Sequence, residues 1–74
     1  MSTVNIPEDI LRDIKEEHPD IVELGIIREE EVNGQIKVLV EVKTSMMYIV
    51  YEYTLDSSRR RILNRNILYA LPLL

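Results

Sequence analysis

The start of the chain has apolar residues at helical spacing. An isoleucine recurs at every fourth position, and charged side chains fill most of the positions between. The apolar set is Ile6, Ile10, Leu11 and Ile14. This spacing predicts an amphipathic helix with one buried face.

The flanking residues indicate where this helix begins and ends. Asn5 and Glu8 have the spacing of a capping box, and Pro7 fits a first helical turn because its missing N–H has no partner there. Pro19 disfavours helical geometry in the residue before it. We therefore expect the helix to begin after Asn5 and to end near His18.

From Ile21 the apolar period changes from helical to alternating. Two alternating stretches flank Asn33-Gly34, and a third follows them. The apolar positions are Val22, Leu24 and Ile26, then Ile36, Val38, Val40 and Val42, then Met47, Ile49, Tyr51, Tyr53 and Leu55. Alternation predicts three strands with one buried face, and Asn-Gly favours a hairpin between the first two.

The first hairpin has two possible registers. A two-residue turn at Asn33-Gly34 would place Glu29 beside Val38, on the core face. A three-residue loop over 32–34 moves the pairing by one residue, so that paired residue numbers sum to 66 and Glu29 faces Lys37 on the outer face. We expect the second register, because it keeps the glutamate out of the core.

A tight turn at Thr44-Ser45 would join the second and third strands, with paired residue numbers that sum to 89. Lys37 would then lie between Glu29 and Glu52. The same pairing predicts a contiguous apolar strip on the outer face, and such strips often mark interfaces. Its members, our interface candidates, are Ile27, Leu39, Val50, Tyr48 and Met46.

The C-terminal segment fits two structures. Asp56-Ser57-Ser58 is typical of a helix start, and helically spaced apolar residues follow it up to Pro72. These residues are Leu63, Ile67, Ala70 and Leu71. The same Asp-Ser-Ser could form a hairpin turn, which would make Arg59 to Asn66 a fourth strand. We expect the helix, and hence a single α+β domain over residues 1–74 with the order α-β-β-β-α, in which both helices cover one face of a three-stranded antiparallel sheet.

Part of the sequence is similar to a known family. DIVELGII at residues 20–27 resembles the strand motif of the PaaD/SufT-like iron–sulfur assembly family, but the cysteine-proline turn and the helix that would follow it are missing. The expected order of elements resembles the α-β-β-β-α folds of signal recognition particle Alu-domain proteins and double-stranded RNA-binding domains, without any matching motif. Since fold does not imply function, we assign the chain to neither group.

Length and composition restrict the setting of the protein. A domain near 74 residues buries only about 60% of the surface that its unfolded chain exposes. With no cysteine, disulfides cannot stabilise it, and a partner subunit is a common alternative. The lack of cysteine also fits a reducing compartment. The acidic N-terminal segment does not resemble a signal peptide, and the charge-free stretch 66–74 is too short to span a membrane. We therefore expect a soluble, cytoplasmic protein.

Charge is distributed unevenly along the chain. Residues 1–33 carry ten acidic and three basic side chains, whereas residues 34–74 carry six basic and three acidic ones. Opposite signs in the two halves suit electrostatic docking of two copies or of a charged partner. The residues that we expect to bind an anion or a partner follow the last acid, Asp56. They are Arg59, Arg60, Arg61 and Arg65.

No pattern predicts catalysis, a cofactor or a metal site. His18 is the only histidine and has no serine or cysteine motif beside it. In a strand, the middle residue of the acidic run 29–31 points to the opposite face, so the three carboxylates cannot converge on a metal. Tyr51 and Tyr53 fall on core positions, and of the tyrosines we expect only Tyr48 on the outer face.

These observations favour a non-catalytic protein–protein interaction module, either a homodimer or a subunit of a larger assembly. The partner would be the chain itself or another protein. The alternative is an RNA- or DNA-binding module that uses Arg59 to Arg61 and Arg65. The net charge of −4 disfavours this alternative, because nucleic-acid binding depends on basic side chains that neutralise phosphates.

Overall fold

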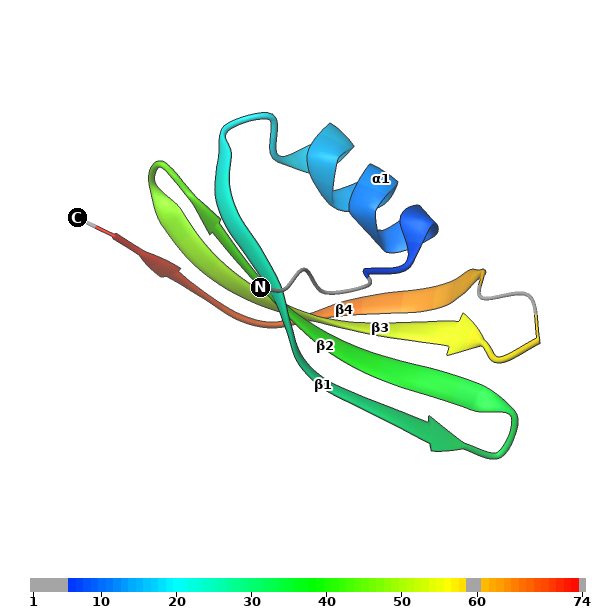
Figure 1. Cartoon of the computed structure of the whole chain (residues 1–74). Helices are drawn as coiled ribbons and strands as arrows, with labels where there is room; N and C mark the ends of the chain where they lie inside the picture. Colours follow the sequence, from blue (N-terminus) through cyan, green and yellow to red (C-terminus); the bar gives the residue numbers. More distant parts are fainter. Residues whose placement is uncertain (1–5, 59–60, 74) are drawn as a thin grey trace.

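The computed structural model describes residues 6–58 and 61–73, which form one helix and a four-stranded antiparallel sheet (Figure 1). In chain order the elements are α1 (Glu8–Glu17), β1 (Ile21–Val32), β2 (Gln35–Thr44), β3 (Met47–Asp56) and β4 (Ile62–Pro72). Strands that follow one another in sequence are neighbours in the sheet, so the strand order is β1-β2-β3-β4. The helix lies over one face, here called the core face; the opposite face is the outer face.

The helix α1 begins slightly later than we expected. Pro7 is its N-cap, with no side-chain hydrogen bond, and the Leu11 N–H donates to the Pro7 carbonyl oxygen at 3.0 Å. Asn5, the expected cap, lies outside the described residues. The C-terminal end is as predicted: His18 is the C-cap, and its N–H donates to the Ile14 carbonyl oxygen at 2.8 Å.

The hydrophobic core lies between α1 and the core face of the sheet. Ile10 and Ile14 of the helix are fully buried. The sheet contributes the alternating residues that the sequence predicts for β2 and β3. These are Ile36, Val38, Val40, Val42, Ile49, Tyr51, Tyr53 and Leu55. The predicted buried face of these two strands is therefore confirmed, except at Met47, which is 36% exposed.

The register between β1 and β2 combines both registers that we considered. Near the turn, Glu29 pairs with Val38 across a two-residue Asn33-Gly34 connection, so the predicted Glu29–Lys37 pair is wrong. Farther from the turn, Ile26 pairs with Val40, numbers that sum to 66 as predicted. A bulge at Ile27 accommodates the change, because one extra residue on a strand shifts its pairing by one.

The predicted register between β2 and β3 is also wrong. Val38 pairs with Tyr53 and Lys37 with Thr54, so paired numbers sum to two more than we expected. The connection lies one residue later than Thr44-Ser45, because the Thr44 hydroxyl accepts hydrogen bonds from the N–H groups of Met46 and Met47 at 3.1 and 3.0 Å. The shift is even, so the core residues stay on the core face.

The predicted second helix is a strand, which replaces the α-β-β-β-α order with α-β-β-β-β. The Asp56 side chain does not start a helix; it accepts hydrogen bonds from the N–H and hydroxyl of Ser58, as in a turn. The Asp56 N–H then donates to the Arg61 carbonyl oxygen at 2.9 Å. The strand satisfies the backbone groups along β3 that a helix would leave without partners. The similarity in element order to the RNA-binding folds is lost with this helix.

Candidate functional site

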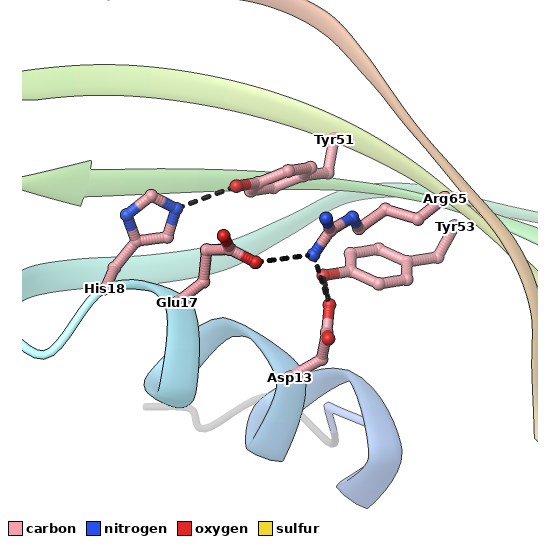
Figure 2. A network of polar contacts seen from close by, with 6 residues as sticks. All are labelled: Asp13, Glu17, His18, Tyr51, Tyr53 and Arg65. Carbon is pink, nitrogen blue, oxygen red and sulfur yellow. Dashed lines mark hydrogen bonds and ion pairs between the residues drawn. The ribbon is translucent and has the colours of Figure 1, made fainter.

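Polar and aromatic side chains from α1, β3 and β4 meet on the core face of the sheet (Figure 2). Three come from the helix and its C-cap, and three from the strands. They are Asp13, Glu17, His18, Tyr51, Tyr53 and Arg65. We call this group the helix–sheet network.

Arg65 is the central donor of the helix–sheet network. Its guanidinium donates to Asp13 Oδ2 at 2.8 Å and to Glu17 Oε1 at 3.0 Å. The hydroxyl of Tyr53 donates to the same Asp13 oxygen at 2.7 Å. One side chain of β4 is therefore bound to two successive turns of α1, which fixes the helix over the sheet.

Tyr51 extends the network toward the end of the helix. Its hydroxyl oxygen lies 2.7 Å from His18 Nε2. The Arg65 guanidinium carbon lies 5.3 Å from the centre of the Tyr51 ring, within the range of a cation–π interaction. His18 thus has a second structural role besides the helix end that the sequence indicated.

In these surroundings the pKa values of both tyrosines and of the arginine are raised. Burial raises the pKa of Tyr53, and its hydrogen bond to Asp13 raises it further. Burial also raises the pKa of Tyr51. The hydrogen bond to Glu17 contributes most to the raised pKa of Arg65. The hydrogen bonds that Tyr53 and Arg65 make to the helix are suited to holding α1 in place.

A shallow hollow of about 230 Å³ lies on the outer face beside Gly25. Its polar groups are paired with one another. Lys43 Nζ lies 3.3 Å from Glu23 Oε1, and the Tyr48 hydroxyl donates to Glu41 Oε1 at 2.8 Å. The second contact raises the pKa of Tyr48 to about 12. Paired groups in an open hollow do not point to a particular ligand.

The structure does not bring the predicted outer-face strip together as one exposed surface. Ile27 and Met46 are exposed, and Leu39 and Tyr48 are half-buried. Val50 is only 3% exposed, because it lies between its neighbours on β2 and β4. The strip also contains charge: Leu39 pairs with Arg28 and with Glu52 rather than with Ile27 and Val50.

The predicted arginine cluster is divided. Arg59 and Arg60 lie outside the described residues. Arg61 is exposed and directly precedes β4, whereas Arg65 binds Asp13 and Glu17 of its own chain. Arg65 is therefore a residue of the helix–sheet network, a role that the sequence did not reveal.

Exposed large apolar residues gather along β4, at one edge of the sheet. Within the described residues, no strand pairs with the free edge of β4. Its large exposed apolar residues, together with the residue that follows it, are Leu63, Ile67, Leu68, Tyr69, Leu71 and Leu73. Tyr69 lies beside Tyr48, with ring centres 6.1 Å apart, so the expectation that only Tyr48 lies on the outer face is wrong. The absence of charge after Arg65 is the sequence signal for this surface.

Comparisons with protein-family models, with curated proteins and with solved structures gave no match. Within residues 6–58 and 61–73, no helix is long and apolar enough to cross a lipid bilayer.

Proposed function

We propose that this chain is a non-catalytic protein–protein interaction module, and that β4 is its binding element. The observation that carries the proposal is an exposed, apolar edge strand. An edge strand offers a row of unpaired backbone N–H and C=O groups to a strand of another chain. On β4, large apolar side chains accompany these groups and would be buried together with them.

The opposite edge of the sheet supports this choice of strand. β1 carries four glutamates and one arginine, and is interrupted by bulges at Val22 and Ile27. Charge and bulges are common devices by which proteins prevent pairing at an edge. β4 also has bulges, at Leu63 and Leu68, but its second half carries no charge. Of the two edges, β4 is the one suited to a partner.

The proposal is tested by the size of the native protein and by one matched pair of variants. Leu68 and Val22 are exposed aliphatic residues at bulges on the two edge strands, 50% and 65% exposed. We expect the wild type to behave as a complex larger than a monomer, both purified and in extracts of its source cells. Leu68→Lys should shift it to the monomer mass, whereas Val22→Lys should not, because a lysine on a binding edge opposes strand pairing.

Light scattering of the pure protein and size-exclusion chromatography of extracts measure this shift. Circular dichroism establishes that both variants are folded. A wild-type chain of monomer mass in both settings contradicts the proposal. If the complex persists in the Leu68→Lys variant, the interaction surface lies elsewhere than on β4.

A further inference from the structure

We propose that the partner strand is β4 of a second copy of this chain, bound antiparallel. The two chains would be related by a two-fold axis that passes beside one of the residues 67–71, so that this residue faces its own copy. This inference rests on the proposed function and names its partner. The two sheets would join into one antiparallel sheet of eight strands.

The local charge distribution of β4 permits self-pairing. When a strand pairs with its own copy about a two-fold axis, residues close to the axis face themselves or their near neighbours. Like charges placed opposite one another are destabilising, and the segment 66–73 contains none. Arg65 lies outside this segment, and its charge is neutralised within the chain by Asp13 and Glu17.

The charge of the rest of the molecule favours pairing of two β4 edges over pairing of two β1 edges. The acidic strand β1 lies at the far side of the sheet from β4. In the proposed dimer the two β1 strands are separated by seven strand spacings, about 33 Å, which greatly exceeds the Debye length of about 8 Å at physiological ionic strength. Pairing of two β1 edges would instead bring eight glutamates together.

Self-pairing through β4 also ends the assembly at two copies. A two-fold interface uses the same surface on both chains and closes, whereas pairing of β4 with β1 would leave a free edge at each end and continue as a filament. The edges that remain in the dimer are the two charged, bulged β1 strands. Such edges resist further pairing.

Geometry gives this proposal a sharp test. In antiparallel strands related by a two-fold axis perpendicular to the sheet, the residue on the axis faces its own copy, with Cα atoms about 4.5–5.5 Å apart. This distance suits a disulfide bond. Because the chain has no cysteine, a single introduced cysteine can cross-link only with its copy.

We therefore design five single-cysteine variants along β4: Ile67→Cys, Leu68→Cys, Tyr69→Cys, Ala70→Cys and Leu71→Cys. Val22→Cys on the β1 edge and Leu39→Cys on the outer face are the controls. Each variant is oxidised mildly, and the covalent dimer is measured by non-reducing electrophoresis. We expect one β4 position to cross-link several-fold more than both controls, with less at the positions on either side. Thermal unfolding identifies any variant that does not fold. Because five positions on the same strand are tested, the loss of one variant leaves the others to decide.

The outcomes separate the inference from the proposed function. A wild-type dimer whose cross-linking is greatest at Leu39→Cys, or equal along β4 and at Val22→Cys, overturns β4 self-pairing but leaves an interaction module. A purified wild type that stays monomeric and shows no preferred β4 position also overturns the inference. The extract experiment then decides whether β4 serves another protein.

Discussion

Arg65 connects the two structural layers at the scale of a single residue. It is placed by β4, it contacts acids in two turns of α1, and its guanidinium lies against the Tyr51 ring. The sequence grouped it with a run of basic residues, where a solvated or partner-binding role was the natural expectation. That role could not be recognised before β4 was known to be a strand, because only the strand brings residue 65 beneath residues 13 and 17.

We predict that Arg65→Met lowers the free energy of unfolding by about 1–2 kcal/mol, since charge-assisted hydrogen bonds at partly exposed positions are lost. The matched control is Arg28→Met, which removes an exposed ion pair with Glu30 at 3.7 Å. The control should change stability by no more than about 0.5 kcal/mol. Urea denaturation followed by circular dichroism measures both. Equal losses in the two variants would show that the network does not hold α1 specifically.

At the scale of elements, the two edge strands share one irregular pattern. Bulges at Val22 and Ile27 in β1, and at Leu63 and Leu68 in β4, interrupt the pairing with the neighbouring strands. As a result, the residues on the core face of the sheet are spaced by three, two and three positions in both strands. In β4 they are Ile62, Arg65, Ile67 and Ala70.

This spacing explains which elements could be predicted from sequence. β2 and β3 pair with each other without a bulge, so their alternation revealed the buried face. In β4 the bulges replace alternation with steps close to a helical period, and a local pattern cannot show that β3 needs a partner on its second edge. The prediction of the β1 register was wrong for a related reason. We chose between two registers that each held along the whole hairpin, whereas the bulge at Ile27 allows one register on each side of it.

We predict that deletion of Ile27 is tolerated. Ile26 and Arg28 already pair with consecutive residues of β2, so removal of the residue between them leaves every cross-strand pair in place. The side chain is half exposed and contributes little burial. We expect the free energy of unfolding to change by less than about 1 kcal/mol.

Deletion of Leu39 is the control. β2 pairs with a strand on each side, and its pairing with β3 has no bulge. A missing residue in β2 would therefore turn the core residues on one side of the deletion to the outer face. We expect this variant to lose cooperative unfolding in urea. If both deletions are equally damaging, the bulge at Ile27 is not the device that reconciles the two registers.

At the scale of the whole molecule, the fold separates charge across the sheet. The acidic strand β1 lies at one edge, and the charge-free segment 66–73 lies at the other. An uncharged edge on an acidic molecule is poorly suited to a polyanion and well suited to an apolar strand. The same separation therefore supports protein binding over nucleic-acid binding.

We accordingly predict that the protein binds generic duplex DNA or RNA more weakly than about 10⁻⁴ M near physiological salt, the weak end of ordinary non-specific binding. Arg65 is bound to Asp13 and Glu17, which leaves Arg59 to Arg61 as the main basic group on a chain of net charge −4. Labelled duplexes are titrated with the wild type and with an Arg59/Arg60/Arg61→Ala variant at several salt concentrations. Tight, salt-sensitive binding by the wild type that the variant loses would replace the interaction module with a nucleic-acid-binding function. If neither protein binds but the variant loses its dimer, the arginines instead contact the acidic surface of the partner chain, and the interface includes these arginines as well as β4.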